Sequence, residues 1–297
     1  MATHSESHYS GRTSSNSSHE TVIIVNCILN APLMLISIIG NTLVLTAILR
    51  TPSLRLPSTI LLCSLAVSDL LVGLIVQPVY ISTKLTENGS LLKTMYLMVP
   101  SASGGSILMM TLISVDRFLA LHYHMRYPNL MTARRAIYTS VLFWLITFLF
   151  SFISFWKMEA YYFIAAVGII ACLIVSTVCY ISIYCVVRKH HRQIHVQQQS
   201  VKRMPANLNQ SMLRSMKCAK NTFIFYIVMI LCYIPWFISL FLSAIFPNQW
   251  ISALVLADSA AFLNSSINPF LYCWRLREIR AAVVKTAKPM LCKKVED

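Results

Sequence analysis

Seven long apolar stretches divide the chain, with polar segments between them. The stretches cover about residues 22–49, 58–83, 93–121, 134–156, 161–187, 221–246 and 251–274. About 20 mostly apolar residues suffice for a helix to cross a bilayer, and backbone groups in lipid must be hydrogen-bonded within the segment. The pattern therefore predicts an all-α membrane protein, built as a seven-transmembrane helix bundle.

Polar and amphipathic segments flank this bundle. The predicted parts are an extracellular N-terminal tail, the seven-transmembrane domain, a short amphipathic eighth helix and a cytoplasmic tail, at residues 1–21, 22–274, 275–286 and 287–297. In the eighth helix, Leu276, Ile279 and Val283 recur at helical spacing. Such a helix is expected to lie on the inner face of the membrane.

Positive charge is distributed unevenly along the chain. The formal net charge is +15, and 21 of the 25 Lys and Arg residues fall in four segments on one predicted side of the membrane, at 50–57, 117–135, 188–220 and 275–297. This is the positive-inside distribution, and it predicts an extracellular N-terminus and a cytoplasmic C-terminus in the plasma membrane. The expected partner of these basic segments is membrane lipid, namely the anionic lipid of the inner leaflet. No nucleic acid is expected, because no nucleic-acid-binding motif accompanies the charge.

Three positions are candidates for covalent modification. Asn16 and Asn88 begin Asn-x-Ser sequons on the predicted outer side, so both are candidates for glycosylation. Cys292 lies beyond the eighth helix and is either palmitoylated or an unmodified thiol. No two of the nine Cys residues fall in outer loops, so no structural disulfide is predicted.

Polar side chains accompany one carboxylate deep within the stretches. Asp69 lies in the second stretch, and such a residue is costly in lipid and indicates function. Small polar residues at similar depth are Asn41, Ser106, Asn264, Ser265 and Asn268. This cluster either holds a cation such as sodium, which suits hard oxygen ligands, or forms a hydrogen-bond network that locks the helices without an ion.

The third, sixth and seventh stretches carry further features that bear on function. Asp116 and Arg117 end the third stretch, where a solvated ion pair is the simplest interpretation. Pro235 and Pro269 lie within the sixth and seventh stretches, and each removes a backbone hydrogen bond. The resulting kinks are either hinges or passive bends packed by neighbouring helices.

Together these residues resemble the rhodopsin-like (class A) G-protein-coupled receptors over about residues 22–286. The family's motifs occur in order, one in each stretch: Gly40-Asn41, Leu65-Ala66-x-x-Asp69, Asp116-Arg117-Phe118, Trp144, Tyr180, Cys232-x-x-Pro235 and Asn268-Pro269-x-x-Tyr272. The chain is loosely similar to the melanocortin, cannabinoid and adenosine receptor group.

The resemblance implies a mechanism. An extracellular ligand would shift a two-state equilibrium, and the sixth helix would swing outward to admit a heterotrimeric G protein. The implied coupling residues are Asp116, Arg117, Phe118, Tyr180 and Tyr272. The implied switch and hinge residues are Cys232, Tyr233, Pro235, Asn268 and Pro269. The residues that match the family's allosteric sodium site are Asp69, Ser106, Asn264, Ser265 and Asn268. Arrestin is a further implied partner, and no other cofactor is expected.

The chain also departs from the family's pattern. Residues 92–97 and 157–160 contain no Cys, so the usual outer disulfide is not expected. The inner end of the sixth stretch carries Ser215, Lys217 and Lys220 without an acid. An acidic partner that restrains Arg117 is therefore not expected there, which predicts raised basal activity.

The resemblance further places a ligand pocket at the outer ends of the helices. Its expected lining is Val99, Ser103, Tyr162, Trp236, Phe237, Asp258 and Phe262. Val99 stands where amine receptors carry Asp, and Phe262 stands where retinal proteins carry Lys, so a monoamine and covalent retinal are disfavoured. The apolar, aromatic wall suits a lipid or a small amphipathic molecule, and a peptide remains open. Asp258 either pairs with a cationic ligand or bonds to a neighbouring hydroxyl or lysine.

Other functional classes find less support. A transporter or channel needs several charges along a path, and only Asp69 and Asp258 lie well inside the stretches. No phosphate-binding loop or Ser–His–Asp arrangement is found, so an enzyme is not expected. A receptor-like protein that binds partners without activating a G protein remains an alternative.

Overall fold

The fold is described by a computed structural model. Backbone is described at 3–86, 89–123, 126–199, 221, 223–239, 242 and 251–292, and side chains at those residues except 3–19, 96, 100, 103, 154–155, 158–160, 162, 190–199, 251–252, 254 and 289–292. Within these ranges every regular element is a helix. The predicted glycosylation site Asn88 lies outside the described residues, as do 293–297 of the predicted tail.

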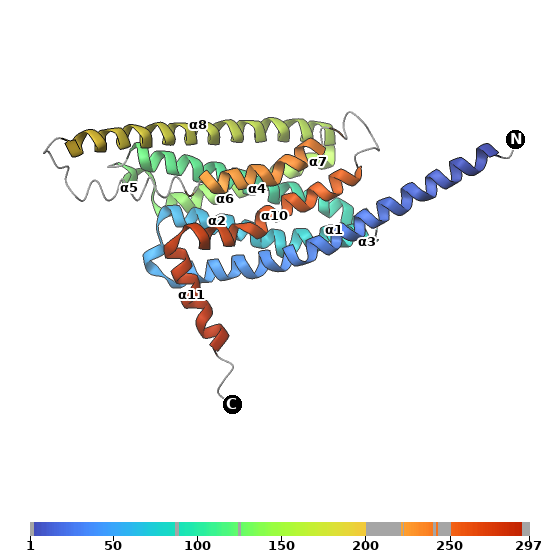
Figure 1. Cartoon of the computed structure of the whole chain (residues 1–297), viewed down its shortest axis with the longest axis horizontal. Coiled ribbons are helices and arrows are strands. Elements are labelled where there is room, and N and C mark those ends of the chain that lie inside the picture. The colour runs from blue at the N-terminus through green and yellow to red at the C-terminus, as the bar shows by residue number, and fades with distance from the viewer. Residues whose placement is uncertain are drawn as a thin grey trace.

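Long helices run side by side as a bundle (Figure 1). The elements that build it are α1 (Thr3–Arg50), α2 (Pro57–Leu71), η2 (Val72–Val76), α3 (Gln77–Thr86), α4 (Gly89–His122), α6 (Ala133–Ser151), α7 (Ile153–Trp156), α8 (Met158–Gln199), the helix Phe223–Ser239 and α10 (Ile251–Arg275). The elements η1 (Pro52–Leu54) and α5 (Tyr127–Leu130) lie in connections, and α11 (Arg277–Cys292) follows α10. Figure 1 shows α11 leaving the bundle at a steep angle.

Each predicted stretch coincides with a helix in the described residues. Five helices are long and apolar enough to cross a membrane, and Phe223–Ser239 and α10 correspond to the sixth and seventh stretches. α1 begins at Thr3, within the segment that we predicted as a polar tail. α11 continues to Cys292, beyond the predicted end of the eighth helix.

Local chemistry sets where the helices begin. Pro57 occupies the first turn of α2, where its missing N–H costs nothing. Thr132 caps α6, because its side chain accepts a hydrogen bond from the backbone N–H of Arg135 at 3.3 Å. The Arg135 guanidinium donates to the carbonyl oxygens of Asn129 and Leu130, both at 2.9 Å, which ties α5 to the start of α6.

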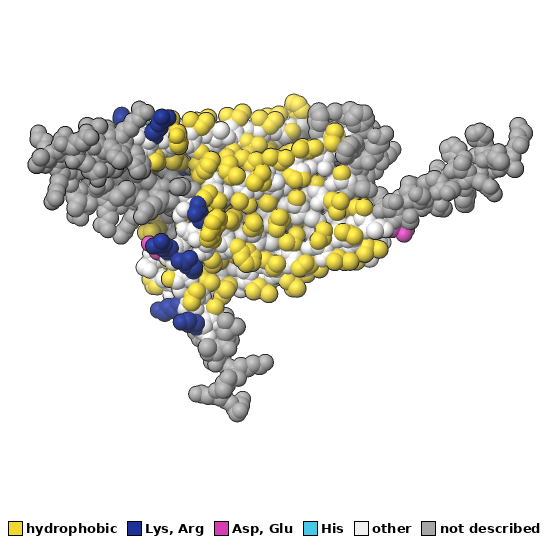
Figure 2. Space-filling view, in the orientation of Figure 1, with side chains coloured by type: hydrophobic (Ala, Val, Ile, Leu, Met, Phe, Trp, Pro, Cys, Tyr) yellow, Lys and Arg dark blue, Asp and Glu magenta, His cyan; other side chains and the backbone are white. Residues whose placement is uncertain are grey.

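The helices differ in how much of their apolar surface is buried inside the bundle. About 62% of the apolar window of α4 is buried, against 17% for those of α1, α6 and α8. α4, which corresponds to the third stretch, is thus the most buried of the helices long and apolar enough to cross a membrane in the described part of the chain. Large apolar side chains elsewhere point outward and form a broad hydrophobic surface (Figure 2). Such a surface is expected of a protein whose solvent is lipid.

Gly40 allows α1 and α10 to approach closely. A Cβ atom built at Gly40 would lie 2.9 Å from Cγ and 3.0 Å from Cβ of Pro269. Both distances are shorter than ordinary carbon–carbon contacts, so only glycine fits against the proline without a shift. The contact brings the polar residues of α10 next to those of α1.

Replacing Gly40 with Ala should therefore destabilise the bundle. We expect a loss of about 1–3 kcal/mol from overpacking against Pro269, measured by thermal unfolding of the detergent-solubilised protein. Gly168→Ala is the matched control, because nothing lies within 4 Å of a Cβ at that position of α8. The control should be neutral or stabilising, since Ala is the better helix former. Equal behaviour of the two variants would contradict the proposed packing.

Candidate functional site

Asp69 is the centre of a buried polar cluster in the bundle. Its side chain is fully buried in α2, and Oδ2 accepts a hydrogen bond of 2.7 Å from Nδ2 of Asn268 in α10. Oδ1 has no hydrogen-bond partner of normal geometry among the described residues. The Ser265 side chain also lies near this carboxylate. A carboxylate oxygen with no donor, surrounded by buried polar groups, has capacity for a further donor or a cation.

Residues of α1 extend the cluster. The Ser37 hydroxyl donates to the backbone carbonyl oxygen of Asp69 at 2.8 Å. Nδ2 of Asn41 donates to the carbonyl oxygens of Ser37 at 2.9 Å and Ser265 at 3.1 Å. The amide of Asn41 thus bridges α1 and α10, and its Oδ1 is also buried without a partner. These bonds hold three helices in register around Asp69.

Two other residues of the predicted sodium site, Ser106 and Asn264, lie in the same region without a hydrogen bond to the Asp69 carboxylate. Ser106 of α4 forms a hydrogen bond of 3.2 Å with Ser68, the residue before Asp69. Asn264 is buried, and its Nδ2 has no partner within the described part of the chain. The structure therefore joins Asp69 to Asn268 and Ser265, and brings Ser106 to the neighbouring position.

Asp116 and Arg117 form a buried ion pair at the inner end of α4. Asp116 has no exposed surface and Arg117 is 8% exposed. The guanidinium of Arg117 bonds to Oδ2 of Asp116, and the Tyr127 hydroxyl donates to Oδ1 at 2.7 Å. The expectation of a solvated pair is therefore wrong, because α5 covers the carboxylate. Breaking a buried pair leaves an unpaired charge, so a movement of Arg117 needs a new partner.

Two buried tyrosines lie on the helices that surround this pair. Tyr180 of α8 packs against Tyr226 and Phe223, with ring centroids 5.1 and 5.2 Å apart. Tyr272 of α10 packs against Phe225 at 5.4 Å. Neither hydroxyl has a hydrogen-bond partner of normal geometry in the described structure. Arg117 is close enough to Tyr180 to interact with it electrostatically.

The remaining predicted coupling and hinge residues occupy ordinary packing positions. Phe118 stacks on His122 with ring centroids 5.3 Å apart. Cys232 and Tyr233 are buried in the helix Phe223–Ser239, whereas Pro235 is exposed. Pro269 lies inside α10 and carries the contact with Gly40.

Near the opposite end of the bundle, Asp258 is bonded to a tyrosine. The Tyr80 hydroxyl donates to Oδ2 of Asp258 at 2.9 Å, and the ammonium of Lys84 lies 5.4 Å from the centre of the Tyr80 ring. Trp236 is a further side-chain neighbour of Asp258. Of the alternatives for Asp258, the structure shows the bond to a neighbouring hydroxyl.

The other predicted ligand residues are partly described. Phe262 is buried and packs edge-on against Tyr80, with ring centroids 5.1 Å apart. Val99 is half-buried beside this pair. Trp236 and Phe237 stack edge to face at 5.3 Å. The side chains of Ser103 and Tyr162 lie outside the described residues, as do those of the modification candidates Asn16 and Cys292.

Sequence reasoning missed a second polar network near Asp258. Nδ2 of Asn26 bonds to the carbonyl oxygen of Val255 and, at 2.8 Å, to the Ser259 hydroxyl. Nδ2 of Asn30 also donates to Ser259 at 2.8 Å. Two asparagines four residues apart in the first stretch were the available signal, because that spacing places them on one helix face.

Gln77 adds an unusual feature near this network. Its side chain is fully buried in the first turn of α3, and neither its amide oxygen nor its amide nitrogen has a partner within the described residues. Helical spacing places it on the same face as Tyr80. A buried amide without hydrogen-bond partners costs free energy. The Gln77 side chain therefore lowers the stability of this part of the bundle.

Comparison with known proteins supplies the family. The model of the family described as 7 transmembrane receptor (rhodopsin family) matches residues 40–159 and 153–272, well over half of the chain. The chain belongs to this family. The receptor is also 28% identical to melanocortin receptor 4 of Danio rerio in an alignment of 284 residues, and the match covers 87% of this chain and 81% of that relative.

Membership confirms the resemblance and the seven-helix bundle. The receptor is a rhodopsin-like G-protein-coupled receptor and a multi-pass protein of the plasma membrane. The family implies an extracellular ligand and a heterotrimeric G protein as partners. Proteins of this family are generally not enzymes. The seven described cysteines are free thiols.

The bond between Tyr80 and Asp258 can be tested by its coupling energy. Tyr80→Phe should cost about 1–3 kcal/mol in thermal stability, because it removes a hydrogen bond to a part-buried carboxylate. A double-mutant cycle with Asp258→Asn isolates the interaction between the two side chains. Tyr138→Phe is the control, since Tyr138 is 71% exposed on α6. Strict additivity of the two changes would show that the bond contributes nothing.

Proposed function

We propose that the receptor binds a small amphipathic ligand with one cationic group at the end of the bundle that contains Asp258. Binding activates a heterotrimeric G protein through outward movement of the helix Phe223–Ser239. The N-terminus is extracellular and the C-terminus cytoplasmic, as the distribution of Lys and Arg supports. Arrestin is a further partner of the activated inner face.

The observation that carries this proposal is the unequal pairing of groups around Arg117. Arg117 is held by Asp116. Among the described residues, the buried Tyr180 and Tyr272 hydroxyls have no hydrogen-bond partner of normal geometry, although Ser114 lies near the Tyr180 hydroxyl. A buried polar group left unpaired costs about 1–3 kcal/mol. Movement of the helix Phe223–Ser239 would let both hydroxyls turn toward Arg117 and recover part of this cost. The structure thus resembles one member of a two-state pair, with the second state able to satisfy these groups.

The polar cluster around Asp69 supports control by sodium. The free Oδ1 of Asp69, the Ser265 and Ser106 hydroxyls and the amide oxygens of Asn264 and Asn268 would supply oxygen ligands. Among the described residues no group of three His, Cys, Asp or Glu side chains gathers, so a site for a transition metal finds no support. Sodium bound among α2, α4 and α10 would resist their relative movement and favour the inactive state.

The surroundings of Asp258 support the ligand class. Asp258 is a carboxylate at this end, and the aromatic residues Tyr80 and Trp236 lie beside it, with Phe262 packed on Tyr80. A carboxylate beside aromatic faces suits a cationic group joined to an apolar body. The zebrafish relative is named a melanocortin receptor, so a melanocortin is the natural comparison in a ligand screen.

The mechanism predicts different behaviour for two tyrosines on α8. Tyr180→Phe should reduce agonist-stimulated nucleotide exchange about three- to tenfold, which corresponds to one hydrogen bond in the active state. Tyr184→Phe should leave nucleotide exchange unchanged, because Tyr184 is 61% exposed on the face of α8 that points away from the bundle. Exchange is measured with purified receptor and G protein, together with surface expression.

Arg117→Ala completes this test. It should abolish the agonist response in a ligand screen read through cAMP and calcium together, while the exposed Arg126→Ala keeps it. An agonist response that survives Arg117→Ala would overturn the assigned mechanism. Agonist binding without any nucleotide exchange in the unmodified receptor would instead favour a receptor-like protein that does not activate G proteins.

Asp69→Asn tests the sodium site. Sodium chloride should lower agonist affinity in the unmodified receptor, and potassium chloride at equal ionic strength should not. The variant keeps a side-chain oxygen for the bond from Asn268 and loses the charge that sodium needs. The sodium effect should therefore disappear, as linkage between two sites requires. A sodium effect of unchanged size in the variant would place the ion elsewhere.

A further inference from the structure

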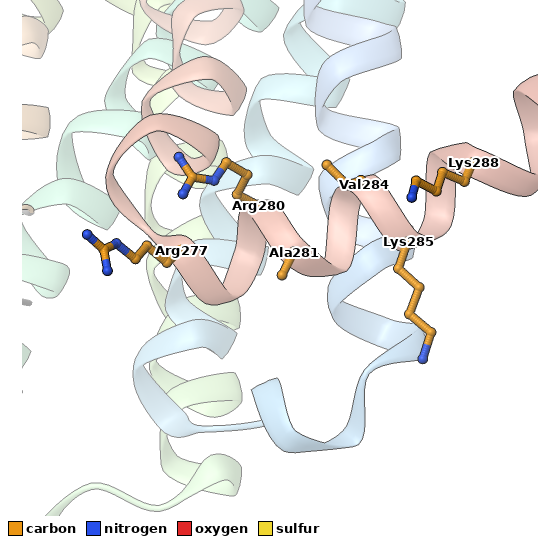
Figure 3. A pocket seen from close by; sticks show the side chains of 6 residues that line it. All are labelled: Arg277, Arg280, Ala281, Val284, Lys285 and Lys288. Carbon is orange, nitrogen blue, oxygen red and sulfur yellow. The ribbon is translucent and has the colours of Figure 1, made fainter.

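The exposed face of α11 carries four cations without counter-charges. Arg277, Arg280, Lys285 and Lys288 line an open hollow together with Ala281 and Val284 (Figure 3). No ion pair involves any of the four within the described residues. Glu278, the acid of α11, does not line the hollow.

The opposite face of α11 is already occupied by protein. Ile279, Ala282, Val283 and Thr286 are buried, and α11 contacts the inner part of α1. The apolar residues that we expected to meet the membrane are thus used to dock α11 on the bundle. What remains exposed is the basic face, with two small apolar side chains in its middle.

The position of α11 places this face beside lipid. Trp274, one turn before α11, is 62% exposed, and the Arg275 guanidinium lies 4.5 Å from the centre of its ring. An exposed Trp next to a cation is typical of the headgroup level of a membrane. Figure 2 shows Lys and Arg side chains gathered where the broad hydrophobic surface ends.

The layout of the cations indicates the charge of the occupant. Figure 3 shows the Arg277 and Arg280 side chains extending the same way from the first turns of α11, and the two lysines follow on later turns. Ala281 and Val284 separate the arginine pair from the lysine pair. Two separate pairs of cations match a headgroup with several phosphates better than one with a single charge. The small apolar patch between the pairs suits the glycerol and first methylenes of an acyl chain.

We propose that this basic face of α11 is a binding site for an inner-leaflet lipid with a polyphosphorylated headgroup. The arginines and lysines bind the phosphates, and Ala281 and Val284 contact the neck of the lipid. The long side chains reach from the helix to the headgroups while their stems lie along the apolar patch. The site is separate from the ligand region around Asp258, and it does not depend on the identity of the agonist.

Native mass spectrometry of the full chain in detergent tests the site. The probes are phosphatidylinositol 4,5-bisphosphate, phosphatidylserine and phosphatidylcholine at equal concentrations. The unmodified receptor should retain the bisphosphate lipid preferentially. Either pair of substitutions, Arg277→Gln with Arg280→Gln or Lys285→Gln with Lys288→Gln, should weaken this binding roughly 25-fold, at about fivefold for each charge removed.

Arg188→Gln with Lys189→Gln is the matched control. It removes the same charge from exposed positions on the inner part of α8, and it should leave lipid binding unchanged. Val284→Glu is a second variant at an exposed position, and it should weaken binding by placing an anion inside the hollow. Thermal unfolding checks that the variants remain folded.

Four outcomes would overturn the proposal. Equal losses in the α8 control would show that only total charge matters. Equal retention of phosphatidylserine and the bisphosphate lipid would remove the need for a polyphosphorylated headgroup. Unchanged lipid binding in the α11 variants, with loss of G-protein nucleotide exchange, would assign the face to a protein partner. Displacement of the lipid by an equal concentration of soluble inositol trisphosphate would likewise contradict a membrane ligand.

Discussion

The hydrogen bond between Asp69 and Asn268 is the interaction on which the organisation of this receptor depends. It joins α2 to α10 through a carboxylate that has no contact with solvent. In a bundle surrounded by lipid, packing alone discriminates poorly between helix arrangements, because lipid is as apolar as the helix surfaces. A buried carboxylate with few donors discriminates strongly, since any arrangement that moves Asn268 and Ser265 away from it leaves it unpaired. Ser37 and Asn41 then fix α1 to the same centre.

The hydrogen bonds that join α1, α2 and α10 contrast with the tyrosine hydroxyls on the helices around Arg117. Ser37 and the Nδ2 atoms of Asn41 and Asn268 are bonded across these helices, although Oδ1 of Asp69 has no partner of normal geometry. The buried hydroxyls of Tyr180 and Tyr272 also have none among the described residues, and they lie on helices that the proposed movement involves. Well-bonded groups resist rearrangement, and unpaired groups favour it. The middle of the bundle is thus suited to act as a fixed frame, while the helices around Arg117 are suited to change their contacts.

The sequence predicted the helices well because lipid imposes simple rules on length and polarity. Asp69 and Asn268 were also recognisable, since a polar side chain within an apolar stretch is conspicuous. The burial of Asp116 was not predictable, because it depends on Tyr127, a residue in a connection that local pattern does not place. The role of Ser259 was equally hidden. A serine in an apolar helix is common, and only the packing of α1 on α10 shows that two asparagines converge on it.

The π-helical turn at Val72–Val76 has a consequence for the second transmembrane helix. A π turn is equivalent to one extra residue inserted into an α-helix. It therefore rotates everything that follows by about 100° relative to an uninterrupted helix. Asp69 lies before the turn and Tyr80 after it, so the two halves of this helix aim their side chains independently. Loss of a single residue within the turn would keep Asp69 in place and swing Tyr80 away from Asp258, so one deletion can alter the recognition end without disturbing the centre.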